Sequence, residues 1–179
     1  APATTAFRSV GIPTRQIYTP RWPHCDDNHA WIEVWCDGDW HYLGACEPEE
    51  VLDKGWFTAA ASRAMIIHSR MFSDYVENEE IVTHEGLTTV CNELSRYADT
   101  QTFSVTVTEN GQPLSGVTLR IELLNYSEFF PISTLVTDEN GKASITLGLG
   151  DLHIHALKDG RFITRLVDTR KEPSVQIDF

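Results

Sequence analysis

The chain has 179 residues and a formal net charge of -12, and this charge excludes nucleic acid as an expected partner because no basic stripe with interleaved aromatics offsets it. No apolar run approaches the roughly 18 residues that span a bilayer, so no membrane span is expected in this chain. The four Cys have no metal-like spacing and are too few for a disulfide scaffold, which leaves the redox compartment and the oligomeric state open.

The composition changes near residue 95 and predicts two domains. All five Trp and all four Cys lie before that point, whereas the rest alternates Val, Ile, Leu and Thr between Asn-Gly turns. Because domains cluster near roughly 100 to 150 residues, a chain of this length accommodates two small ones. We therefore expect one domain over residues 1–98 and a second over 99–179.

The first predicted element is a helix over residues 2–11. Apolar residues recur there at helical spacing, Gly11 occupies the C-cap position, and Pro13 prevents continuation. No capping residue precedes the periodic run, so we expect the end of a longer helix. A strand over 15–19 and a polar loop over 20–28 follow.

The strongest local signal is a hairpin with strands at 29–36 and 39–45. Asp37-Gly38 between them readily adopts the positive φ angles of a type I′ turn. With a two-residue turn, the numbers of opposing residues sum to 75. The expected pairs are Trp35 with Trp40, Trp31 with Gly44, and His29 with Cys46.

The remainder of the first domain is less regular, and the second is regular throughout. Between residues 47 and 75 the segment TAAASRAM favours a helix and AMIIHS a strand, and the two remain alternatives. Residues 96–101 resemble a linker. Seven alternating strands follow, punctuated by Asn-Gly and Asp-Gly turns, and they predict an all-β sandwich. The expected strands are 102–108, 117–124, 132–137, 143–147, 151–157, 161–167 and 174–178.

His29 is the main candidate for chemistry. It opens a strand directly after a polar loop, where an imidazole is partly exposed yet held by a rigid scaffold. It is either a general base under an aromatic shelf or an ordinary strand-end histidine. The surrounding Trp residues, Trp22 and Trp31 above all, either line a substrate groove or pack the hairpin.

Two stretches carry a family resemblance. RSVGIPTRQIYTPRW followed by NHAWIEVWCDGDWHYLGACEP resembles the second half of a transglutaminase-like core, a relative of papain-like cysteine proteases, over roughly residues 3–60. The resemblance implies an α+β papain-like half-core with an antiparallel sheet. It also implies a Cys-His-Asp triad in which His29 activates a thiolate for acyl transfer or amide hydrolysis on peptide or protein substrates, without metal or organic cofactor. Residues 42–48 are also similar to peptide N-glycanases.

The nucleophile of that family is not among these residues. The resemblance places the Cys at the start of the helix that leads to Gly11, several residues before Ala1, where a helix N-terminus lowers a thiol pKa. Cys25 lies four residues before His29 but has acidic neighbours, which raise rather than lower a thiol pKa. We therefore expect the isolated chain to be inactive.

The orienting acid of the family is also replaced. Its position, four residues after Trp40, is Gly44 here, and a glycine cannot steer an imidazole. Glu47 is the nearest substitute, and it faces His29 only through a bulge or a register that sums to 76. We assign His29 and Glu47 as catalytic candidates, and Trp22 and Trp31 as substrate-binding candidates.

The last 80 residues resemble a carboxypeptidase-regulatory or prealbumin-like β-sandwich of immunoglobulin-like type, chiefly through the DENGKA turn. Such modules brace a neighbour or contact a surface, which favours an extracellular or cell-surface location. His153 and His155 share a strand face and either grip a metal or face solvent. The alternative function is a non-catalytic surface module that binds peptide or glycan. No metal site is assigned.

Overall fold

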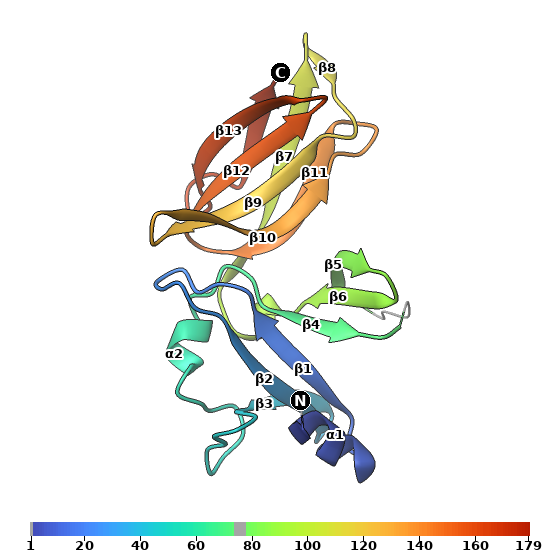
Figure 1. Ribbon diagram of the computed structural model, residues 1–179, viewed down its shortest axis with the longest axis vertical. Helices are drawn as coiled ribbons and strands as arrows, with labels where there is room; N and C mark the ends of the chain where they lie inside the picture. Colours follow the sequence, from blue (N-terminus) through green and yellow to red (C-terminus); the bar gives the residue numbers. More distant parts are fainter. Residues whose placement is uncertain (1, 74–77) are drawn as a thin grey trace.

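The computed structural model describes residues 2–73 and 78–179. A six-stranded antiparallel sheet forms the N-terminal part, and two smaller sheets form a β-sandwich that follows it (Figure 1). The first helix lies at the end of the six-stranded sheet that is farther from the sandwich, and the C-terminus lies at the end of the sandwich that is farther from this sheet (Figure 1). No helix in the described ranges is long and apolar enough to cross a membrane.

The six-stranded sheet has the order β3-β2-β1-β4-β6-β5. Its elements are α1 (Pro2–Ser9), β1 (Thr14–Thr19), β2 (His29–Cys36), β3 (Asp39–Leu43), α2 (Thr58–Ala61), β4 (His68–Met71), β5 (Glu80–Glu85), β6 (Thr88–Asn92) and the 3-10 helix η1 (Leu94–Arg96). The predicted helix ends where expected: Gly11 has φ +86°, and the Ile12 amide bonds to the Phe7 carbonyl at 3.1 Å.

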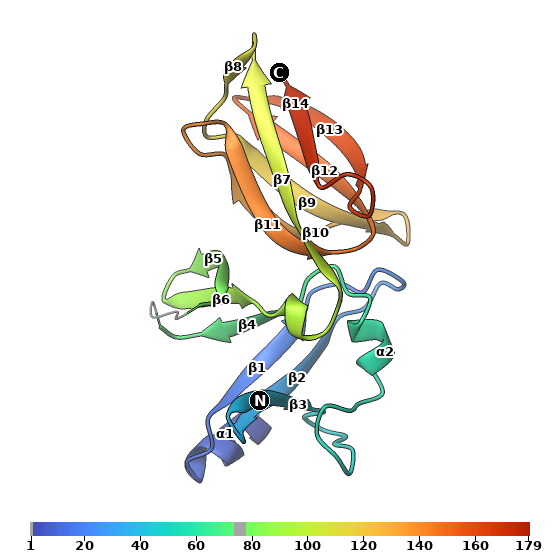
Figure 2. The same ribbon diagram turned by 180° about the vertical axis from the view of Figure 1, so that it is seen from behind.

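The sandwich consists of one sheet with the order β10-β9-β12-β13 and another with the order β11-β7-β14, to which β8 is attached (Figure 2). Its strands are β7 (Thr100–Glu109), β8 (Gln112–Pro113), β9 (Thr118–Asn125), β10 (Glu128–Val136), β11 (Lys142–Gly148), β12 (Asp151–Lys158), β13 (Arg161–Asp168) and β14 (Ser174–Asp178). All pairings are antiparallel except that of β14 with β7. Each of the seven predicted strands has a counterpart.

The expected α+β papain-like core is wrong, because the described chain is mostly antiparallel strand. Its helices have only eight, four and three residues. The TAAASRAM segment yields just the four-residue α2, after which 64–67 run as a buried connection into β4. The hairpin of β5 and β6, for which we predicted no element, adds two more strands. The fold is therefore β-sandwich-like with a neighbouring sheet.

The predicted hairpin register is confirmed as far as the strands extend. Trp35 pairs with Trp40, and the pairing continues to Ile32 with Leu43, so opposing numbers sum to 75 rather than 76. β3 then ends, and the expected pairing of His29 with Cys46 does not form. His29 pairs instead with Thr19 on β1.

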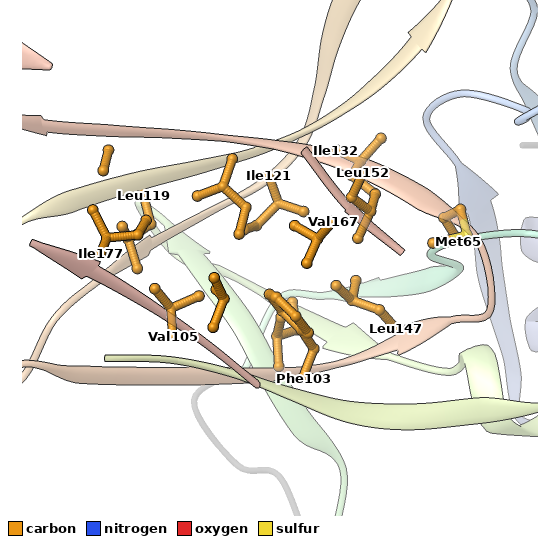
Figure 3. Packing of buried hydrophobic residues seen from close by; sticks show 14 of the residues in the cluster. Met65, Phe103, Val105, Leu119, Ile121, Ile132, Leu147, Leu152, Val167 and Ile177 are labelled. Atoms are coloured by element: carbon orange, nitrogen blue, oxygen red, sulfur yellow. The ribbon is translucent and has the colours of Figure 1, made fainter. Parts of the chain in front are cut away.

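Two apolar cores are joined by one short segment. The sandwich core fills the space between its sheets with residues such as Phe103, Leu119 and Ile121, and Met65 enters it from one end (Figure 3). The core of the first sheet surrounds Trp31 and includes Ile67. A single buried stretch, 64–67, therefore supplies side chains to both cores.

Candidate functional site

The structure places His29 at the start of β2 in a cluster with the rings of Trp22, Trp31, Trp56 and Phe57, called the aromatic cluster below. Its half-buried ring lies 4.7 Å from the Trp56 ring, 4.8 Å from Phe57, 5.7 Å from Trp31 and 6.4 Å from Trp22, measured between centroids. Pairing of β2 with β1 fixes the backbone of His29, while 55–58 bring Phe57 against the ring from the other side. The imidazole is thus held by regular structure and surrounded by apolar surface.

Trp22 and Trp31 form the buried part of the aromatic cluster rather than an exposed surface. Their rings are parallel at 6.5 Å, and their exposed fractions are 2% and 0%. The indole of Trp31 donates to the Tyr97 hydroxyl at 2.9 Å, which satisfies its one polar group. Trp56 is 61% exposed and brings the aromatic cluster to the surface, although no local pattern singled it out among the five tryptophans.

The electrostatics of His29 combine burial with nearby negative charge. Burial lowers the pKa of His29, and the carboxylates of Glu47 and Asp27 partly oppose that shift. Its Nε2 atom is buried and has no hydrogen-bond partner among the described residues. Such an unpaired buried nitrogen carries a desolvation cost that a further polar group at this point would relieve.

Glu47 lies close enough for its charge to act on His29, but no hydrogen bond joins them in the described structure. One oxygen of its carboxylate instead accepts a 3.0 Å hydrogen bond from the indole of Trp56, the ring that lies against His29. The backbone conformation of this segment accounts for a glycine at position 44, three residues before Glu47. A Cβ on Gly44 would lie 2.7 Å from the Glu47 carbonyl oxygen and 3.7 Å from its Cγ. The chain therefore folds back over Gly44 and brings Glu47 to the space that a side chain at position 44 would enter.

The four cysteines are free thiols, and within the described residues no thiol is hydrogen-bonded to His29. Cys25 is half-buried against the Trp31 core, and Cys46 is exposed. Burial, with the nearby Glu93 and Glu79, raises the pKa of Cys91 to about 11, which makes it inert. No group of metal-binding side chains forms in the described ranges, and His153 bonds to Glu122 at 2.7 Å.

A buried ionic network supports the aromatic cluster and was missed from the sequence. Arg15 pairs with Glu33 at 2.6 Å and with Glu93 at 2.7 Å, and Glu33 accepts a hydrogen bond from the hydroxyl of Tyr97, which holds Trp31. Burial, partly offset by Arg15, raises the pKa of Glu93 to about 7. Glu33 lies in the largely apolar β2, and Arg15 is its direct cross-strand partner in β1, so this charged pair was the available signal.

Comparison with known proteins gives a partial assignment. Residues 2–45 match the family model of the transglutaminase-like superfamily. No curated protein matches the chain. A solved structure described as that of the Streptococcal ancillary pilin matches at a TM-score of 0.35 and 9% identity, over 92% of this chain and 60% of that protein, and a likeness this weak supports no conclusion. The family match includes His29 and Gly44 and ends before Glu47.

Proposed function

We propose that this chain carries the histidine-bearing half of a transglutaminase-like thiol site, which performs acyl transfer or amide hydrolysis on peptide-like substrates. The observation that carries the proposal is His29 itself. It lies within the segment that matches the superfamily and inside the aromatic cluster, with a lowered pKa and a buried Nε2 that has no hydrogen-bond partner among the described residues. An imidazole that is neutral near pH 7 is a competent proton acceptor.

The proposed reaction uses His29 as base and then as acid. His29 accepts the proton of a thiol, the thiolate attacks the substrate carbonyl, and the imidazolium returns the proton to the leaving amine as the acyl-enzyme forms. Water or an acceptor amine then takes the acyl group, and the thiol is regenerated. The thiol is proposed to lie at the N-terminal end of a helix that continues α1 backwards, because no described thiol bonds to His29.

Glu47 is proposed to act as the acid of the site. Its charge stabilises the imidazolium that forms during the reaction, and its hydrogen bond fixes Trp56 against the His29 ring. The fold-back at Gly44 supports this role because it brings the Glu47 chain to the position of the missing side chain. Trp56, exposed beside His29, is proposed to contact the acyl part of the substrate, while the buried Trp22 and Trp31 support the His29 ring from behind.

The test uses the full-length protein that contains this chain, with any residues that precede α1. Labelling of its thiol by iodoacetamide is measured against pH for wild type, His29→Ala and the control His84→Ala, whose exposed side chain lies on β5, away from the aromatic rings around His29. We expect the His29 variant to lose about 100-fold in labelling rate at pH 7, within the range of general base catalysis. The control should remain at the wild-type rate.

Equal labelling of the wild type and the His29 variant would contradict the proposal. A parent sequence with no Cys at the start of that helix would also contradict it, and would favour the alternative of a peptide- or glycan-binding module. A second measurement separates Glu47 from His29. The Glu47→Gln change should lower the imidazole pKa of His29 further, as followed by NMR titration, whereas Glu49→Gln should leave it unchanged.

A further inference from the structure

Every sheet in this molecule has two edges, and natural proteins cover or interrupt such edges to prevent pairing with other chains. In the six-stranded sheet, β3 is covered because Tyr42 exchanges two 2.9 Å hydrogen bonds with Asp53. The other edge strand, β5, has an irregular register between Ile81 and Thr83. Both edges are therefore closed or interrupted.

Three of the four sandwich edges are protected in the same way. β10 contains Pro131 and a register shift beside it. β11 is capped by side chains, since the Thr146 amide donates to Glu80 at 3.0 Å and its carbonyl accepts from Asn92 at 2.7 Å. β14 has only five residues. These devices leave β13 as the one long edge without protection in the described structure.

β13 has the features of a pairing strand. All eight of its residues pair with β12 without a bulge, it contains no proline, and no strand pairs with its other side within the described chain. It lies at the outer edge of its sheet, beyond β12 (Figure 1). Its outward face carries Phe162 and Leu166, which are 66% and 69% exposed, with the exposed Thr164 between them.

The charges on β13 do not protect it either. Arg161 pairs with Glu109 at 2.7 Å, and Arg165 pairs with Glu172 at 3.4 Å. Each guanidinium group is thus turned toward a carboxylate of its own molecule. A charged edge discourages pairing only when its charge is available to repel the incoming strand.

We propose that β13 pairs antiparallel with β13 of a second copy of this chain, around a two-fold axis at Thr164. This register places Phe162 opposite Leu166 of the second copy on the outward face, twice by symmetry, and Thr164 opposite its own copy. On the inward face Ile163 lies opposite Arg165. Apolar and Thr–Thr pairs are favourable cross-strand neighbours. The two four-stranded sheets then become one continuous sheet of the dimer.

The neighbouring registers are worse because they break both apolar pairs. An axis at Ile163 puts Phe162 across from Thr164 of the other copy. An axis at Arg165 places Phe162 against Asp168. Neither register keeps the apolar cross-strand packing that stabilises a sheet. The sequence of β13 therefore favours one self-complementary register.

The experiment measures the mass of the 179-residue chain by sedimentation equilibrium at micromolar to submillimolar concentration. Wild type should pass from 20.2 kDa toward twice that mass as concentration rises. Thr164→Lys and Thr164→Glu each place like charges across the axis, so each should weaken association about tenfold. An equimolar mixture of the two should recover it, because Lys then faces Glu. Phe162→Ser should also weaken association by removing both apolar pairs.

Thr134→Lys is the matched control, because Thr134 is an exposed threonine on the opposite edge of the same sheet. It should associate as wild type does. A wild-type chain that stays monomeric throughout would overturn the proposal, and an unrelated strand would then be the candidate occupant of β13. The proposal also fails if the mixture of charged variants associates no better than either variant alone. Circular dichroism of each variant confirms that the sheet is intact.

Discussion

His68 is buried within β4, and its protonation should oppose folding. Burial, with a smaller effect of Arg70, lowers the pKa of His68 to about 4, and its Nδ1 has no partner among the described residues. In the unfolded chain the imidazole titrates near 6.5. Between about pH 6.5 and about pH 4 the imidazole is protonated in the unfolded state but stays neutral in the folded state. The free energy of unfolding therefore falls as the pH drops through this range. Over this whole pH range the free energy of unfolding falls by about 3 kcal/mol.

We predict that His68→Phe removes this dependence while retaining the ring contact with Tyr18. Urea unfolding at pH 7.5 and pH 4.5 should show a smaller loss of stability in the variant than in wild type. Glu93 acts in the opposite direction, because its raised pKa adds stability as pH falls through 7, but it contributes equally to both proteins and cancels. His84→Phe, at an exposed position, should keep the wild-type loss. An equal loss of stability between pH 7.5 and pH 4.5 in wild type and in the His68 variant would show that His68 is not the source of the pH dependence.

Local sequence was enough to predict His29 as a site residue, but it did not predict the buried Glu93 or the contact of Trp56 with His29. His29 could be selected because it opens a strand after a polar loop, and that depends only on local sequence. Glu93 could not, because its burial comes from packing against Arg15, 78 positions earlier. Trp56 was overlooked for the same reason, since its contact with His29 depends on how 44–57 fold back. Long-range contacts, rather than local pattern, decide which side chains become buried.

The tip of the β9–β10 hairpin holds the loop that leads to His29. The side-chain amide of Asn125 donates to the Trp22 carbonyl at 2.7 Å and to the Cys25 carbonyl at 3.1 Å, and it accepts from Arg21 at 2.8 Å. These bonds join the sandwich to the loop over 20–28. A hairpin that is remote in sequence thus positions one wall of the candidate site.

We predict that Asn125→Ala releases this loop and costs about 2 kcal/mol, since it leaves buried carbonyl and guanidinium groups unpaired. Hydrogen exchange of the Trp22 amide, which bonds to the Asp27 carbonyl at 2.9 Å, should accelerate in the variant. Glu128→Ala removes only a partly exposed ion pair with Arg21 and should cost under about 0.5 kcal/mol. Equal exchange in both variants would show that Asn125 does not hold the loop.

Elements with strong local signals were predicted well, and those formed by context were not. The Asp37-Gly38 hairpin and the helix stop at Gly11 follow from turn chemistry and appear as expected. The hairpin of β5 and β6 has polar, irregular residues, and it forms against β4. The papain-like expectation failed at this level, because the helices of the described chain are short and β4, β5 and β6 extend the sheet after the four-residue α2.

The two parts of the molecule share one buried connection. The Gly148 amide bonds to the Met65 carbonyl at 3.1 Å, and the Met65 side chain lies in the sandwich core. The backbone amide of Thr146 donates to the side chain of Glu80, and its carbonyl accepts from the side chain of Asn92, so the first part is bonded to the sandwich here. The division into domains at residues 98 and 99 remains a proposal. This packing favours cooperative unfolding of the two, because separating them would expose 64–67 and leave polar groups unpaired.

Gly148 provides the test of that coupling. A Cβ there would lie 2.1 Å from the Ala64 carbonyl oxygen, and this backbone atom cannot move without shifting the shared segment. We predict that Gly148→Ala costs about 3 kcal/mol, at the upper end of overpacking, and splits a single calorimetric transition into two. Gly150→Ala is the control, because its Cβ would meet only the flexible sulfur of Met65 at 2.9 Å and should keep one transition. Two transitions already present in wild type would instead mean that the two parts unfold independently and that the shared segment does not couple them.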